Sequence, residues 1–238
     1  MIADGSVLYF NQKRKIYKGI DMRILFIGNS HTFVHYVPLR VKAYFESRGQ
    51  KADVTMLTHP GVGLDWHLKQ SQTYFNLICG NYDALILQHN AHPFPGKESL
   101  LNSGIAIKKL VNEGTRVYLY MTWSEKKNPE GQKIMSRSYE DLAEAIDAQV
   151  CPVGDLWWKI KERYPDELYF DDGEHSSVFG ASLAAAVIGK TLLKEDLDIE
   201  KCYETAKELE ALSFDPRMID LVMRDGQYDL LSKEEQGE

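Results

Sequence analysis

Four side chains in this sequence have the types and the spacing that acyl-transfer chemistry needs. Ser30 follows a short apolar run and a Gly-Asn pair, Asn90 follows a later apolar run, and Asp172 lies three residues before His175. A serine nucleophile needs a histidine to take its proton, and the histidine needs a carboxylate to orient it. An asparagine amide supplies a neutral donor for an oxyanion. These residue types therefore indicate hydrolysis or transfer of an acyl group.

Each of these residues, taken alone, also has a structural explanation. Serine is a common helix cap, so Ser30 fits the start of the helix that follows it. Asp172 fits a cap of a later helix, His175 fits a loop at that helix start, and Asn90 fits a turn. Asp171 is an alternative to Asp172 as the orienting carboxylate. The choice depends on the elements that position these side chains.

Short apolar strands alternate with helical segments along most of the chain. The expected strands are 23–27, 53–58, 82–88, 116–122 and 150–153. The expected helices are 37–47, 64–79 (in two pieces), 99–112, 131–147, 155–163 and 178–193. This alternation predicts a parallel sheet with helices on both faces, and right-handed crossovers leave few topologies open. We predict an α/β fold, a three-layer α/β/α sandwich around a flavodoxin-like five-stranded parallel sheet in the order 2-1-3-4-5.

The loops that follow the strands of such a sheet meet at one crevice. Ser30 lies in the loop after the first strand, Gly61 and Gly63 after the second, and Asn90 after the third. Trp123 begins the loop after the fourth strand, and the Asp/His pair lies beyond the fifth. The topology thus favours a catalytic role for the serine over a capping role.

Four blocks of this sequence resemble, in order, those of the SGNH (GDSL-like) hydrolase family. The resemblance extends over roughly residues 22–193. It is closest to a bacterial branch with a Gly-Asn-Ser nucleophile block and a Met-Thr-Trp after the fourth strand. The blocks are Gly28-Asn29-Ser30, Pro60-Gly61-Val62-Gly63, Gln88-His89-Asn90 and Asp172-Gly173-Glu174-His175, with Met121-Thr122-Trp123 as the additional match.

The resemblance implies a serine esterase or deacetylase that uses no metal and no other cofactor. It implies Ser30 as the nucleophile, His175 as the general base and Asp172 as the residue that orients His175. The implied oxyanion hole consists of the backbone N–H groups of Ser30 and Gly61 with the side-chain amide of Asn90. Gly63 is an alternative to Gly61. The expected substrate is a small ester, such as an O-acetylated carbohydrate.

Three residues depart from the family pattern. Asn29 and Ala91 stand where the family has aspartate, and Gln88 stands where it has glycine. These departures motivate a second hypothesis, a non-catalytic carbohydrate-binding module on the same fold, because a fold does not dictate a function.

Six of the seven histidines lie between residues 31 and 92, several of them on the loops of the expected crevice. Together with Asp65 they suggest a third hypothesis, a metal-dependent hydrolase. The sequence has no HExxH or equivalent ligand spacing, so we predict no metal site. Instead, His31, His89 and Trp123 are predicted to line the substrate pocket.

The composition excludes several classes of partner. The 238-residue chain has a net charge of −7, which argues against general binding of nucleic acid. Its three cysteines are widely spaced and imply neither a disulfide framework nor a zinc site. We see no signal peptide and no apolar run long enough to span a membrane, so a cytoplasmic location is expected.

The expected domain organisation is simple. Residues 1–21 are predicted to be an N-terminal extension, and residues 22–238 a single hydrolase domain. Within it, residues 200–238 are predicted to form a helical extension that packs on the sheet or on a partner subunit.

Overall fold

The computed structural model describes residues 19 and 21–214. The rest of the predicted N-terminal extension lies outside the described residues. So does the end of the predicted C-terminal extension, with the apolar residues Ile219, Leu221 and Val222.

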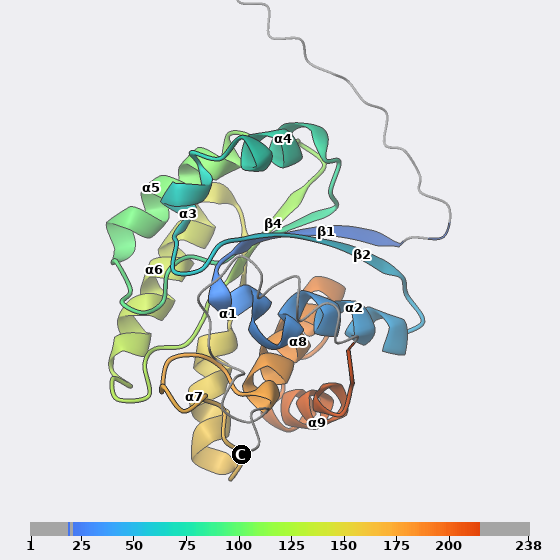
Figure 1. Ribbon diagram of the computed structural model, residues 1–238, viewed down its shortest axis with the longest axis vertical. Coiled ribbons are helices and arrows are strands. Elements are labelled where there is room, and N and C mark those ends of the chain that lie inside the picture. The colour runs from blue at the N-terminus through green and yellow to red at the C-terminus, as the bar shows by residue number, and fades with distance from the viewer. Residues whose placement is uncertain (1–18, 20, 215–238) are drawn as a thin grey trace, which may run out of the picture.

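The centre of the fold is a five-stranded sheet in which every pair of neighbouring strands is parallel (Figure 1). The strands are β1 (Met22–Gly28), β2 (Ala52–Thr58), β3 (Ala84–Leu87), β4 (Arg116–Tyr120) and β5 (Gln149–Cys151). Their order is β2-β1-β3-β4-β5, as predicted. The apolar run of β1 is buried on both faces, as expected of a central strand between two layers of helices. The predicted fold class is confirmed.

Two layers of helices cover the two faces of the sheet. One layer consists of α2 (Val37–Ser47), α7 (Val153–Arg163), α8 (Val178–Leu193) and α9 (Ile199–Glu210). The other consists of α3 (Leu64–His67), α4 (Ser71–Cys79), α5 (Lys97–Lys108) and α6 (Gly131–Ile146). Each layer encloses its own apolar cluster against the sheet, which is the arrangement that makes a three-layer sandwich.

Three strands end earlier than predicted, and two short helical segments were not predicted. β3 ends at Leu87, before Gln88. β5 ends at Cys151 because Pro152 has no N–H for the ladder, and α7 begins at Val153. β4 ends at Tyr120, before Thr122. The short helix α1 (Ser30–Phe33) and the 3-10 turn η1 (Val34–Tyr36) fill the stretch between β1 and α2.

Within the described residues, no helix is both long and apolar enough to cross a membrane. Helix α9 packs on the face of the sheet that α8 covers, through Cys202, Ala206 and Leu209.

Candidate active site

Ser30 is the first residue of α1, directly at the carboxyl end of the central strand β1. The cap of this helix is Asn29, whose side-chain oxygen accepts a hydrogen bond from the N–H of His31. The alternative in which Ser30 caps the helix is therefore wrong. The hydroxyl of Ser30 does not cap the helix and contacts His175 instead.

The turn before Ser30 is held by Gln88, one of the three departures from the family pattern. Its Oε1 accepts hydrogen bonds from the backbone N–H of Asn29 at 2.8 Å and from the hydroxyl of Thr32 at 2.9 Å. Gly28 leaves room for this arrangement, because a Cβ at Gly28 would collide with the side chains of Thr32 and Gln88. The Gln88 side chain thus fixes the turn, at a position where the SGNH hydrolases that the sequence resembles have glycine.

Ser30, His175 and Asp172 form a continuous chain of hydrogen bonds. The hydroxyl oxygen of Ser30 lies 2.9 Å from Nε2 of His175, and Nδ1 of the same ring lies 2.6 Å from Oδ2 of Asp172. The side chains of His175 and Asp172 are 14% and 32% exposed, so the chain is partly shielded but reachable from solvent. This is the order of contacts in which a histidine can take a proton from a serine while a carboxylate orients it.

The carboxylate of Asp172, and not that of Asp171, occupies the orienting position. Its second oxygen, Oδ1, accepts hydrogen bonds from the backbone N–H groups of Glu174 at 2.8 Å and His175 at 2.9 Å. Partial burial pushes the pKa of Asp172 upward, but these N–H groups and the His175 ring outweigh it, so the pKa lies below its usual value. The carboxylate is therefore charged at neutral pH. The later helix α8 is capped by Ser177 instead.

Asn90 lies beside the glycine loop, held there by Asn29. Nδ2 of Asn29 donates to the carbonyl of Val62 at 2.9 Å and to Oδ1 of Asn90 at 3.0 Å. The Asn90 amide nitrogen in turn lies 3.4 Å from the carbonyl of Gly61. The structure thus brings Asn90 and Gly61 together. The Ser30 N–H is in the first turn of α1, where helix amides have no acceptor within their own helix.

The two glycines of this loop differ in their surroundings. Gly61 has a left-handed φ of 67°, and a Cβ there would meet nothing within 4 Å. A Cβ at Gly63 would collide with Asp65 and with the ring of His89. Gly63 is thus required by packing, whereas the space beside Gly61 is open. Ala91 is buried in the apolar cluster beneath the loop.

The three side chains predicted to line the substrate pocket are buried, as Ser30 is. His31 is 5% exposed, His89 1% and Trp123 0%. Nδ1 of His89 accepts from the N–H of Leu64 at 3.0 Å, which makes His89 part of the support of the glycine loop. The Trp123 indole N–H donates to the carbonyl of Glu174 at 2.8 Å, which ties it to the loop of His175. These contacts support the loops of the site, and contact of the three side chains with a substrate stays a prediction.

The clustered histidines form pairs with each other and with backbone groups. Nε2 of His31 lies 3.0 Å from Nδ1 of His92, and Nε2 of His67 lies 2.8 Å from the carbonyl of Gly28. In the part of the chain that the structure describes, no three His, Cys, Asp or Glu side chains are grouped to hold a metal ion. His92 was not singled out from the sequence. Its only signal is that it follows β3, the neighbour of β1, in the sheet.

Comparisons with known proteins show which solved structures share this fold. No protein-family model matches the chain, and no curated protein matches it. A DUF4886 family protein from Bacteroides uniformis has a similar structure, with a TM-score of 0.63 and 16% identity over 89% of this chain and 98% of its own. A variant of Axe2, an acetyl xylan esterase from Geobacillus stearothermophilus, gives 0.56 and 15% over 76% and 98%.

A third similar structure is LAE5, an alpha/beta hydrolase from the metagenome of Lake Arreo in Spain. Its TM-score is 0.57, with 12% identity over 78% of this chain and 97% of its own. The chain shares its fold with these proteins. At such identities the likeness concerns the fold alone, and it agrees with the resemblance to SGNH hydrolases that the four sequence blocks carry.

Proposed function

We propose that this protein is a serine-dependent ester hydrolase of the SGNH (GDSL) type, an esterase or deacetylase. The observation that carries the proposal is the chain of contacts from Ser30 through His175 to Asp172, at 2.9 and 2.6 Å. A serine so placed has the base and the oriented carboxylate that nucleophilic acyl transfer needs.

In the proposed reaction, Oγ of Ser30 attacks the acyl carbon while Nε2 of His175 takes the hydroxyl proton. The negative charge on the carbonyl oxygen is stabilised by the N–H groups of Ser30 and Gly61 and by the Asn90 amide. His175 then gives its proton to the leaving alcohol. A water molecule, deprotonated by His175, attacks the acyl-enzyme and releases the acid, and the proton returns to Ser30.

For the substrate we propose an O-acetyl group on a carbohydrate. The proposal is supported by the likeness in fold to Axe2, which is named as an acetyl xylan esterase. A small acyl group also suits a nucleophile that is itself 4% exposed, because a long chain would have to displace packed side chains to reach it.

The direct test is labelling by a fluorophosphonate probe, followed by turnover of 4-nitrophenyl acetate and acetylated xylooligosaccharides. We expect labelling and turnover with the wild-type protein and neither with Ser30→Ala. Equal labelling of both proteins, or of neither, would sink the serine mechanism. Saturable binding of acetylated xylooligosaccharides without turnover would favour the binding-module hypothesis, and loss of activity on strong chelation would favour the metal-dependent one.

A further inference from the structure

His31 and His92 form a hydrogen-bonded imidazole pair next to the catalytic base. Their rings join through Nε2 of His31 and Nδ1 of His92 at 3.0 Å. The His31 ring also stacks on the ring of His175, with centroids 5.0 Å apart and planes 24° apart. The pair thus touches His175 on the ring face, whereas Ser30 and Asp172 touch its edges.

The hydrogen-bond partners at the two ends of the pair define where its protons are. Nε2 of His92 lies 3.0 Å from the carbonyl of Trp123, which only accepts, so this nitrogen carries a proton. In a neutral His92 ring, Nδ1 is then an acceptor, and Nε2 of His31 must donate to it. The contact at Trp123 is the shorter of the two end contacts, 3.0 Å against 3.3 Å between Nδ1 of His31 and Oδ1 of Asn29, so we assign the Nε2–H tautomer to both rings.

The other end of the pair has a place for one more proton. Nδ1 of His31 faces Oδ1 of Asn29 at 3.3 Å. This oxygen is fixed in place because the Asn29 nitrogen donates elsewhere, to Val62 and Asn90. In the neutral pair, two acceptors face each other there. A proton on Nδ1 of His31 would complete this hydrogen bond at the cost of a buried positive charge.

The surroundings keep that proton off at neutral pH. Burial lowers the pKa of His31 well below 6.5, and the neighbouring His92 and His175 lower it further, against the carbonyl of Glu174. For His92, burial lowers the pKa to about 4, although the Trp123 carbonyl and the more distant Glu125 and Asp172 carboxylates raise it.

From this geometry we infer that His31 is a positioning residue for His175, and that His92 holds it neutral and in the Nε2–H tautomer. The inference rests on the proposed function of Ser30 and His175. When His175 takes the serine proton it becomes a cation, and a neutral ring stacked on it attracts that charge. A protonated His31 would repel it and oppose the transfer.

The first test is the tautomeric state of the wild-type protein. Long-range ¹⁵N–¹H correlation spectra at pH 7 report the proton on each histidine nitrogen, and the spectrum of His92→Gln assigns the His92 signals. We expect neutral Nε2–H rings for both His31 and His92. A charged ring or an Nδ1–H tautomer in either residue overturns the inference, whatever the activity of the protein.

The second test is the pH dependence of fluorophosphonate labelling of Ser30 between pH 5.5 and 9. In His92→Ala, His31 loses its partner and some of its burial and takes a proton more readily. Because His31 and His175 are coupled, the acid limb of the rate should move up by about 0.5 pH unit or more. In His92→Gln the amide can accept from His31 and donate to Trp123, so the limb should return toward the wild-type position.

The outcomes distinguish failure of the proposed function from failure of the positioning role. If the wild-type protein is not labelled at all, the proposed function fails. If it is labelled but the His92→Ala limb coincides with the wild-type limb, or Ala and Gln variants shift alike, only the positioning role is overturned. A purely structural role for His92 would lower the amount of active protein at every pH without moving the limb.

Discussion

At the scale of single residues, the amide of Asn29 controls the direction of the amide of Asn90. Because Nδ2 of Asn29 donates to Val62 and to Oδ1 of Asn90, the nitrogen of Asn90 faces the carbonyl of Gly61. In the proposed reaction this nitrogen also donates to the oxyanion. An aspartate at position 29 has no N–H to donate, so its carboxylate would face two other acceptors, the Val62 carbonyl and Oδ1 of Asn90. We expect Asn29→Asp to lower kcat/KM for 4-nitrophenyl acetate about 10- to 100-fold, less than the roughly 100- to 1,000-fold loss when an oxyanion donor is removed outright.

The control for this prediction is the Asn90→Ala variant. If Asn29 acts through Asn90, the double variant should lose little more activity than either single one, since residues that share an interaction are not additive. Fully additive losses would mean that Asn29 acts by another route. Turnover measured on equal amounts of folded protein distinguishes these results.

The residues of the candidate site differ in how far the sequence could predict them. Ser30, Asp172 and His175 were predicted because strand ends converge in a doubly wound sheet, and the structure brings them into contact. The contact of Gln88 with the Asn29 N–H could not be predicted, because it depends on a glutamine rotamer 59 residues away. The burial of Trp123 and the partial burial of His92 also depend on tertiary contacts that the sequence does not reveal.

At the scale of elements, the loop between β2 and α3 has no room for a side chain at Gly63. A Cβ there would collide with the His89 ring, which is fixed by Leu64 on one nitrogen and lies 3.2 Å from the Ser99 hydroxyl on the other. We expect Gly63→Ala to lower the free energy of unfolding by about 1–3 kcal/mol, as overpacking does. Urea unfolding measures this.

Gly114 supplies the matched comparison. A Cβ at Gly114 would meet nothing within 4 Å. Gly114→Ala should therefore leave the free energy of unfolding within about 0.5 kcal/mol of the wild-type value. A similar cost at both positions would show that the collision at Gly63 is relieved by movement of the loop.

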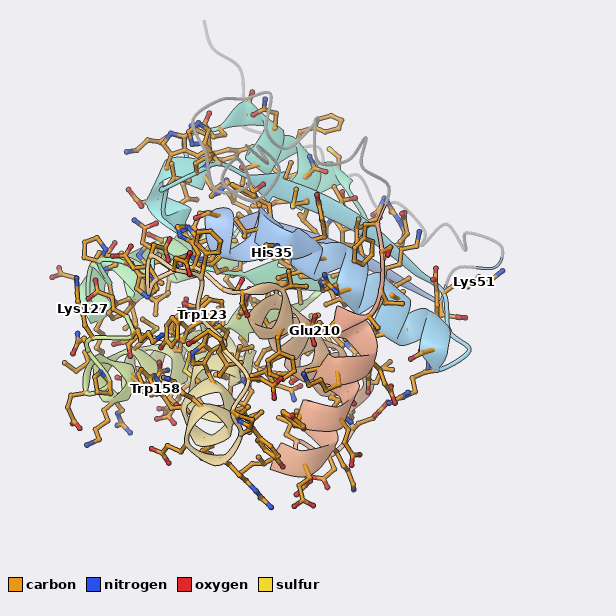
Figure 2. The ribbon with its side chains drawn as sticks, turned by 60° about the horizontal axis from the view of Figure 1, so that its bottom comes forward. His35, Lys51, Trp123, Lys127, Trp158 and Glu210 are labelled. Carbon is orange, nitrogen blue, oxygen red and sulfur yellow. The ribbon has the colours of Figure 1, made fainter. Side chains whose placement is uncertain are left out.

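Arg40 of α2 joins the η1 turn to the end of α9, on the side of the molecule where His35 and Glu210 are marked in Figure 2. It is 3% exposed, and its guanidinium donates to the carbonyls of His35, at 2.8 Å, and Leu209. Burial lowers the pKa of Arg40 to about 10, so it is still charged at neutral pH. We expect Arg40→Met to destabilise the protein by about 2–4 kcal/mol, because two buried carbonyls lose their donor.

The variant Arg40→Lys tests whether a positive charge alone is enough at this position. An ammonium on a single stem lacks the planar fork that reaches two carbonyls at once, so lysine should restore only part of the stability. The exposed Arg137 of α6, with a side chain 75% exposed, is the control, and Arg137→Met should cost less than about 1 kcal/mol. Full stability in Arg40→Lys would mean that charge alone suffices at this position. Thermal and urea unfolding measure the three variants.

At the scale of the whole molecule, the fold was more predictable than the site. Apolar runs such as Ala84–Leu87 mark strands locally, and their alternation with helical segments fixes a parallel sheet. Helix α2 was predicted with its observed bounds, whereas α1 and η1 were not. The latter depend on left-handed backbone at His35 and Tyr36, with φ of 52° and 63°, which residues other than glycine seldom adopt and a sequence pattern seldom signals.

Burial of several histidines makes the stability of the whole molecule sensitive to acid. Burial lowers the pKa of His35, His89 and His92 to about 4 each, that of His31 well below 6.5, and that of His67 below 6.5. An unfolded chain binds protons on these histidines near their usual pKa of 6.5, so between about pH 6.5 and 4 the unfolded state holds more protons than the folded state. Stability is then fully present above pH 7 and is lost as the pH falls.

The expected size of this effect follows from the number of histidines. Each buried histidine contributes a slope of up to about 1.4 kcal/mol per pH unit, so the free energy of unfolding should fall by several kcal/mol from pH 7 to pH 5. Urea unfolding at half-unit steps of pH measures the slope. His89→Gln removes one of the five groups and should make the slope shallower, since a glutamine binds no proton in either state. A free energy of unfolding that stays level from pH 7 to pH 5 would mean that these rings take up protons in the folded state.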